Sequence, residues 1–150
     1  MSSRSGLVGT AQTVLFAGFA AVYFLDPSPR SVGGDPTLTV VGDGLCLVGV
    51  VLLVVALQTI GKSIQIAPAP RVDATLVTHG VYRVLRHPIY SAIVLVLAGL
   101  VLRGATVAAT VLAALSVSFL LVKARYEETL LSAHYPEYEA YRKRTRGVLF

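Results

Sequence analysis

Two polar segments of an otherwise apolar chain hold the residues whose types and spacing could do chemistry. They are residues 76–90, LVTHGVYRVLRHPIY, and residues 123–144, KARYEETLLSAHYPEYEAYRKR. In the first segment, Pro88 suits the first turn of a helix, where no backbone N–H is needed. The free N–H groups at such a helix start can hold an anion, and Arg86 would add a fixed charge with a fork of donors. The first segment therefore has the parts of an anion-binding site.

The same segment can also be interpreted as a belt of membrane anchors. Tyr82 and Tyr90 offer aromatic faces that can hold a cation or stack on a flat ring. Tyr, Arg and His are, however, ordinary side chains at a membrane boundary. His87 has no second His or Cys at ligand spacing, so we expect no metal site. Chemistry alone leaves the binding site and the interfacial belt as open alternatives.

Two adjacent carboxylates, Glu127 and Glu128, stand in the second segment. Adjacent helical residues point about 100° apart, so we expect only one of them to face the first segment. That carboxylate could accept hydrogen bonds from a ligand, whereas Lys123 and Glu127 could equally form an ordinary i,i+4 pair at a charged helix end. Tyr138 and Tyr141 share a helix face and are expected to pack the tail onto the membrane or the site.

Two other features do not indicate a site. Gly42, Asp43 and Gly44 do not form a dinucleotide-binding loop, because the third glycine is missing and an apolar helix follows. Cys46 lies in an apolar run with no base nearby, so we expect it to be structural. As the one cysteine, it also excludes an internal disulfide.

The surrounding composition is that of an integral membrane protein. Of 150 residues, 55% are hydrophobic and 14% charged, and the mean hydropathy is +0.72. A soluble domain carries roughly a quarter charged residues, so the composition excludes a soluble enzyme and a disordered chain. The length suits a single membrane domain over residues 1–150.

Four long runs without Asp, Glu, Lys or Arg are the predicted membrane helices. They are residues 5–25, 44–61, 87–102 and 104–122. A membrane-spanning helix needs about 20 apolar residues, and the third run is short for this. Arg103 and Gly104 nevertheless predict a tight turn into the fourth run. A hairpin of two apolar helices can bury its side chains only in the membrane, so we expect the third run to be a membrane helix as well. The first run is long for the apolar part of a signal peptide, so we expect a retained helix.

The predicted hairpin places Pro88 and Val122 near one membrane surface, so the two polar segments should meet. Residues 62–86 contain two prolines and a glycine turn and are expected to be extended. The tail should continue the fourth helix, break at Pro136 and form a short helix over residues 137–146. The predicted fold is an all-α bundle of about four transmembrane helices with a cytosolic helical tail.

The basic residues predict the orientation of this bundle. With both termini inside, 11 of the 13 Lys and Arg lie on the cytosolic side, and Arg30 and Arg103 lie outside, which follows the positive-inside rule. Residues 26–37 then form a plain external connection. The 11 basic and five acidic residues leave the cytosolic side at +6. This excess indicates topology and contact with anionic lipid, so we expect no nucleic-acid partner.

Residues across both polar segments also match a known family pattern. The matching strings are Leu76-Val77-Thr78, Gly80-Val81-Tyr82 and Arg86-His87-Pro88-Ile89-Tyr90, then a helical hairpin, Glu127-Glu128, Tyr138 and Tyr141. Together they resemble the isoprenylcysteine carboxyl methyltransferase family and the related phospholipid methyltransferases. These are integral membrane enzymes that use S-adenosylmethionine. The resemblance covers roughly residues 61–146, a little over half of the chain.

The resemblance implies a cofactor site built from residues 61–90 and 123–146. The implied S-adenosylmethionine contacts are Thr75, Leu76, Val77, Tyr82, His87, Pro88, Ile89, Tyr90, Glu127 and Glu128, with Glu127 favoured of the pair. Arg86 joins them as the anion-binding side chain argued above. On the substrate side, the resemblance implies Lys123 or Arg125. His79 and Ser91 depart from the residues common in the family, which leaves the acceptor open.

The chemistry of this cofactor agrees with the residues present. Its sulfonium, ammonium, carboxylate, hydroxyls and adenine are complemented by a Glu, anion-binding N–H groups and aromatic faces. Methyl transfer needs mainly positioning, which can contribute roughly 7–11 kcal/mol, so a missing acid–base dyad is no objection. The expected acceptor is lipophilic or membrane-embedded: a prenylcysteine carboxylate, a lipid amine or a small thiol. It would enter from the bilayer, and the cofactor from the cytosol.

Two other functions fit the composition. A membrane reductase of the sterol-reductase type, using NADPH, has a similar C-terminal hairpin and tail, but such chains are usually longer. A non-enzymatic four-helix transporter needs an ionisable residue deep in a helix. Asp43, near the outer end of the second run, is the only residue of that kind.

Overall fold

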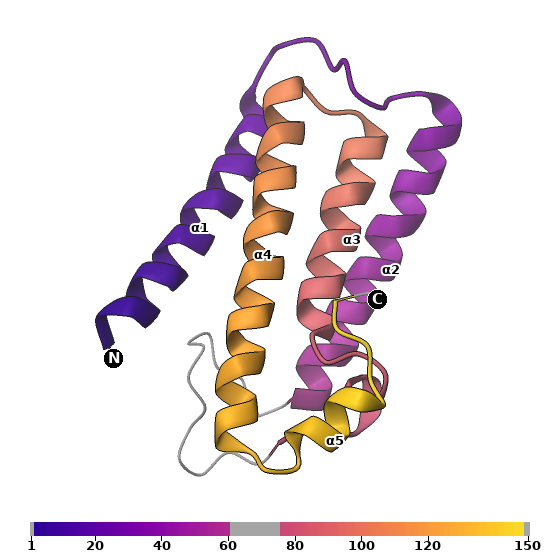
Figure 1. Ribbon diagram of the computed structural model, residues 1–150. Coiled ribbons are helices and arrows are strands. Elements are labelled where there is room, and N and C mark those ends of the chain that lie inside the picture. Colours follow the sequence, from indigo (N-terminus) through magenta and orange to yellow (C-terminus); the bar gives the residue numbers. More distant parts are fainter. Residues whose placement is uncertain (1, 61–75, 149–150) are drawn as a thin grey trace.

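A computed structural model describes residues 2–60 and 76–148 as a bundle of helices (Figure 1). In chain order the elements are α1 (Ser2–Leu25), α2 (Pro36–Ile60), the 3₁₀ turn η2 (Gly80–Arg83), α3 (Pro88–Arg103), α4 (Val107–His134) and α5 (Tyr138–Lys143). Within those described ranges, extended pairing is limited to two isolated bridges. The predicted all-α architecture, with a helical tail after the last long helix, is confirmed.

Among the residues that the structure describes, three helices are long and apolar enough to cross a membrane. These spans are Gly6–Leu25, Pro36–Ile60 and Val107–His134. The shorter α3 is also apolar, and its 16 residues measure only ~24 Å. Large apolar side chains on the outer faces, such as Val40 and Leu47 on α2, are exposed, as expected for contact with lipid. The chain is therefore a multi-pass integral membrane protein.

The ends of α3 and α4 follow local sequence signals. Pro88 occupies the first turn of α3, where a missing N–H costs nothing. At the other end, Gly104 has φ +130°, a backbone conformation that residues other than glycine rarely adopt. Thr106 then caps α4 by accepting a hydrogen bond from the Ala109 N–H at 3.2 Å. The predicted tight turn between the third and fourth helices is thus present.

Three predicted boundaries differ from those observed. The second helix begins at Pro36 rather than at residue 44, so Asp43 lies within it. In residues 62–86, which the sequence predicts to be extended with a glycine turn, the turn at Gly80 is present at φ +57°, but it continues as a 3₁₀ helix over Gly80–Arg83 rather than as extended chain. Residues 61–75 lie outside the described residues. The tail helix is shorter than predicted, because it covers only Tyr138–Lys143.

The closest helix packing joins α2 and α3. A Cβ added to Gly99 would lie 2.5 Å from the Gly42 carbonyl oxygen and 2.6 Å from Cys46 Sγ. A Cβ on Gly49 would lie 2.8 Å from the Ala92 carbonyl oxygen. Small residues allow such close backbone approach between membrane helices. The third helix is therefore connected to α4 by a hairpin turn but packs mainly against α2.

The first helix is fastened to the bundle at the end away from α5. There Phe19 and Tyr23 are buried with Ala109 and Ala113 of α4, and the Tyr23 hydroxyl donates to the Leu100 carbonyl at 3.1 Å. Towards its N-terminus, α1 diverges from α4 (Figure 1). The two ends of the bundle are thus built differently, and the polar segments lie at the other one.

Candidate active site

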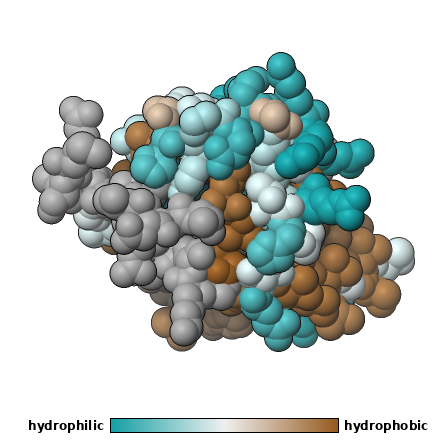
Figure 2. All heavy atoms as spheres, turned by 90° about the horizontal axis from the view of Figure 1, so that it is seen from below, coloured by the Kyte–Doolittle hydropathy of each residue, from teal (hydrophilic) through white to brown (hydrophobic). Residues whose placement is uncertain are grey.

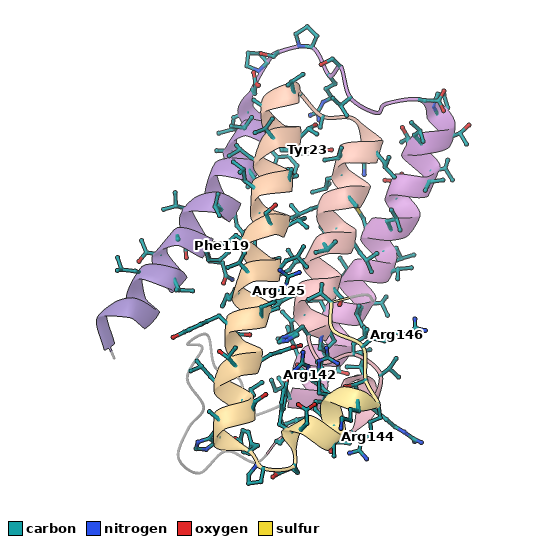
Figure 3. All side chains as sticks on the ribbon, in the orientation of Figure 1. Tyr23, Phe119, Arg125, Arg142, Arg144 and Arg146 are labelled. Carbon is teal, nitrogen blue, oxygen red and sulfur yellow. The ribbon has the colours of Figure 1, made fainter. Side chains whose placement is uncertain are left out.

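The two predicted polar segments meet at one end of the bundle. The fourth helix has 28 residues and measures ~42 Å, so its last turns extend past the start of α3 and lie beside α5, while η2 packs against α2. Seen from this end, polar residues gather along one side of the face, with apolar residues beside them (Figure 2). Arg142, Arg144 and Arg146 lie at this end, whereas Tyr23 lies towards the other (Figure 3). The prediction that the hairpin brings the two polar segments together is confirmed by the contacts between them.

Glu127 faces the start of α3. The Tyr90 hydroxyl donates to this carboxylate, at 2.7 Å from one oxygen and 2.8 Å from the other. Lys123 Nζ is 3.8 Å from Glu127 Oε1 and 5.4 Å from the centre of the Tyr90 ring. Lys123 is buried, and its ammonium donates to Gln12 Oε1 on α1 at 2.6 Å. The i,i+4 pair considered from sequence therefore exists, but inside the site rather than on a solvated helix end.

Glu128 faces the segment before α3 and the tail. Arg86 Nε donates to Glu128 Oε1 at 2.7 Å, and Arg142 Nε is 3.7 Å from Glu128 Oε2. The expectation that only one of the two adjacent carboxylates faces the first polar segment is therefore wrong. That segment covers a wide arc of α4, because Tyr90 meets the helix on one side and Arg86 on the other.

His87 lies between the two carboxylates. Its side chain is 7% exposed, with Nδ1 3.8 Å from Glu127 Oε2 and Nε2 3.4 Å from Glu128 Oε1. The imidazole is parallel to the Tyr90 ring, with centroids 5.3 Å apart. In the part of the chain that the structure describes, Nε2 is buried and makes no hydrogen bond. Its contact with Glu128 Oε1 is at ion-pair distance without hydrogen-bond geometry, so a ligand can supply the hydrogen bond that a buried polar atom usually makes.

Arg86 has less free donor capacity than its sequence position suggested. Besides Glu128, its guanidinium donates to the carbonyls of Arg142 at 3.0 Å and Thr145 at 2.5 Å. Its backbone N–H donates to the Arg146 carbonyl at 2.7 Å. The predicted anion-binding fork is thus largely occupied by the protein itself, and Arg86 ties the tail to the segment that precedes α3.

Tyrosines of the tail complete this connection. The Tyr141 hydroxyl donates to the Tyr82 carbonyl at 2.6 Å, and the Tyr138 and Tyr141 rings meet edge-on, with centroids 5.9 Å apart. All three side chains are buried, and burial raises the pKa values of Tyr82 and Tyr141 to about 12. Of the two packings considered from sequence, onto the membrane or onto the site, the structure shows the tail tyrosines packed against η2 within the protein.

The remaining predicted residues differ in their placement. Pro88 is buried, while Leu76, Val77 and Ile89 are half-buried around the same end of the bundle. Arg125 is exposed, so of the two basic residues considered for the substrate, Lys123 is the one inside the cluster. Thr75 lies outside the described residues.

Sequence reasoning missed three residues of this region: Gln12, Arg142 and Thr145. Gln12 gave a usable signal, because it is the only amide side chain in the first apolar run. Arg142 and Thr145 gave none, since basic and hydroxyl residues are common in a polar tail.

Comparison with known proteins agrees with this geometry. The family model of the phospholipid methyltransferases matches residues 37–138. The fold is similar to a solved structure of the eukaryotic intramembrane Ras methyltransferase, isoprenylcysteine carboxyl methyltransferase, with a TM-score of 0.61 and 24% sequence identity. That match covers 97% of this chain and 51% of the Ras methyltransferase chain. This chain therefore spans about half the length of the Ras methyltransferase. None of the curated proteins matches the sequence.

The matched range reaches from α2 to the start of α5, so it includes the start of α3 and the paired glutamates. The likeness to the Ras methyltransferase shows the fold, and the family model, which covers more than half of the chain, shows the family. The chain therefore belongs to the phospholipid methyltransferase family of membrane methyltransferases.

Proposed function

We propose that this protein transfers a methyl group from S-adenosylmethionine to a lipophilic or membrane-embedded acceptor. The observation that carries the proposal is the buried polar cluster where α3 begins, in which His87 lies between Glu127 and Glu128 and one of its ring nitrogens makes no hydrogen bond. Family membership supplies methyl transfer as the reaction. The cluster supplies a place for a charged donor beside apolar helices.

The side chains present fit the parts of this donor. The Glu127 carboxylate and the Tyr90 ring suit the cationic sulfonium and ammonium groups. His87 Nε2 can form a hydrogen bond with a polar group. In the first turn of α3, the N–H groups of Ile89 and Tyr90 have no carbonyl acceptor within the helix. They can therefore donate hydrogen bonds to an anionic or carbonyl oxygen of the donor.

When bound, the donor supplies a methyl group that is activated by the sulfonium charge. The protein's residues then have to orient the two reactants and exclude water, which is where most of the rate enhancement of such a transfer can arise. Tyr90 holds Glu127 through both carboxylate oxygens, so the acidic side of the site is pre-oriented. No side chain is required to move a proton in the transfer step itself.

Lys123 is the residue that we place on the acceptor side. It is buried on α4 and is joined to α1 through Gln12, so it lies where the cluster meets a helix that faces lipid. An acceptor that reaches the site from the bilayer would pass this lysine. The distribution of basic residues favours a cytosolic site, with both termini on the same side.

Neither of the other functions has comparable support. A reductase would bring a different cofactor to a family defined by methyl transfer. A transporter would need Asp43 to titrate deep in a helix, but this residue pairs with Arg103 at 2.9 Å, and both side chains are about half exposed.

Calorimetry on the 150-residue chain in detergent tests the donor. We expect the parent to bind S-adenosylhomocysteine and not NADPH. His87→Ala and Tyr90→Phe should each weaken this binding about fivefold to 150-fold, because losing one hydrogen bond to a buried polar group costs roughly 1–3 kcal/mol. Asp43→Asn, which changes a charge at the far end of the bundle, should bind like the parent. Unchanged binding in both site variants, or binding of NADPH instead, would refute the proposal.

A further inference from the structure

The side-chain hydroxyl of Tyr138, in the tail, is buried but makes no hydrogen bond to the residues described around it. Tyr138 is 1% exposed, and within residues 2–60 and 76–148 its hydroxyl oxygen makes no hydrogen bond. Native proteins pair nearly all such groups, because an unpaired one loses its hydration without compensation. Among the described residues, the only other buried side-chain atom in this condition is His87 Nε2.

Tyr141, three residues further on, shows what a structural tyrosine does here. It is equally buried, and its hydroxyl donates to the Tyr82 carbonyl at 2.6 Å. That bond fastens the tail to η2. Tyr138 contributes its ring to the same packing, against the Tyr141 ring, but a phenylalanine would provide this contact equally well. The Tyr138 hydroxyl therefore needs another explanation.

The surroundings of this hydroxyl are those of the site. Burial raises the pKa of Tyr138 well above its usual range, and the nearby Glu128 raises it further, while Arg86 and Arg142 act in the opposite direction. The hydroxyl thus stays protonated and can donate a hydrogen bond. Glu128 is also the residue that His87 Nε2 approaches at 3.4 Å. The two atoms that make no hydrogen bond therefore share Glu128 as a neighbour.

We propose that the Tyr138 hydroxyl binds the methyl donor directly, at the charged amino-acid end of S-adenosylmethionine, as a second ligand contact beside His87. This inference rests on the function proposed above. Among the parts of that donor, the ammonium and carboxylate are the groups that a neighbourhood of Glu128, Arg86 and Arg142 can complement, whereas adenine is neutral. The tail then contributes a binding residue rather than only a cover.

The test compares Tyr138→Phe with Tyr141→Phe in the same detergent. Each variant is titrated with S-adenosylhomocysteine and with 5′-methylthioadenosine, which lacks the amino-acid end, and thermal unfolding is followed without ligand. We expect Tyr138→Phe to lose at least about fivefold in affinity for S-adenosylhomocysteine, as for one lost hydrogen bond. Its affinity for 5′-methylthioadenosine should not change. Without ligand it should unfold at the parent's temperature or above, whereas Tyr141→Phe should unfold at a lower temperature.

Three results would overturn this inference while leaving the proposed function intact. Unchanged affinity of Tyr138→Phe for S-adenosylhomocysteine would mean that the hydroxyl is satisfied by water. An equal loss with both ligands would place it on the nucleoside part. A fall in the unfolding temperature without ligand would make its role structural. If the parent itself fails to bind S-adenosylhomocysteine, the proposed function fails first, and this inference fails with it.

Discussion

The two adjacent glutamates differ in what holds them. Glu127 accepts a hydrogen bond from the neutral Tyr90 hydroxyl, and its nearest cation, Lys123, is 3.8 Å away. Glu128 is paired with Arg86 at 2.7 Å, and the same guanidinium is bound to tail carbonyls. Glu127 therefore has more of its charge available for a cationic ligand than Glu128, whose shortest contact, with Arg86, docks the tail.

This difference predicts opposite effects for two matched substitutions. Glu127→Gln should lower the affinity for S-adenosylhomocysteine about tenfold to hundredfold, because a charge-assisted hydrogen bond contributes roughly 1.5–3 kcal/mol, and it should leave the unfolding temperature near that of the parent. Glu128→Gln should mainly lower the unfolding temperature, since the largely buried Arg86 loses its carboxylate. Calorimetry and thermal unfolding of both variants measure the two effects. The reverse pattern would make Glu128 the ligand contact.

At the scale of the elements, the site depends on how α3 is held. This helix carries His87 at its start and is short, but glycines let its backbone approach α2 closely. Without a hydrophobic driving force between helices in lipid, such close contact is a main source of association. The position of the site's first half is therefore set by α2, a helix that contributes no predicted site residue.

Two glycines on α2 provide a matched test of this packing. Gly49→Ala places a Cβ 2.8 Å from the Ala92 carbonyl oxygen, whereas Gly44→Ala meets no atom within 4 Å. Gly49→Ala should destabilise the protein by about 1–3 kcal/mol through overpacking and also weaken S-adenosylhomocysteine binding. Gly44→Ala should be neutral or stabilising by up to about 1 kcal/mol, as alanine is the better helix former. Equal stability of the two variants in thermal unfolding would contradict this account.

At the scale of the whole molecule, the polar chemistry is gathered at one end of the bundle. The tail, η2 and the end of α4 lie there, while the connection between α1 and α2 and the turn at Gly104 lie at the other end (Figure 1). The end with the site also carries most of the basic residues. From the positive-inside rule we expect this end to lie in the cytosol, where a water-soluble donor is available.

Cysteine labelling in intact cells checks this orientation. In a Cys46→Ala background, single cysteines at Ser2 and Gly147 should be shielded from an impermeant thiol reagent, whereas a cysteine at Ser28, in the connection between α1 and α2, should react. The Ser28 variant shows that the reagent reaches the outer surface. Labelling of the Ser2 or Gly147 variant from outside would reverse the proposed topology and move the site to the other side of the membrane.

Much of this architecture could be predicted from local sequence. The apolar runs required membrane helices, because no other structure satisfies backbone polar groups in lipid. Pro88 and Gly104 marked the ends of α3 through their own backbone preferences. Chain order then brought the two polar segments to one end of the bundle. Each of these features depends on residues that are neighbours in the chain and on the lengths of the apolar runs. Both can be read directly from the sequence.

The pairing of side chains was decided only by the tertiary structure. Helices that are apolar all round have no polar stripe to show which face turns inward. The rotation of α4 that lets Glu127 meet Tyr90 and Glu128 meet Arg86 therefore left no mark in its sequence pattern. The same holds for the approach of Gln12 to Lys123 across two helices. Such contacts depend on how whole helices rotate and cross, which the packing of the bundle as a whole determines.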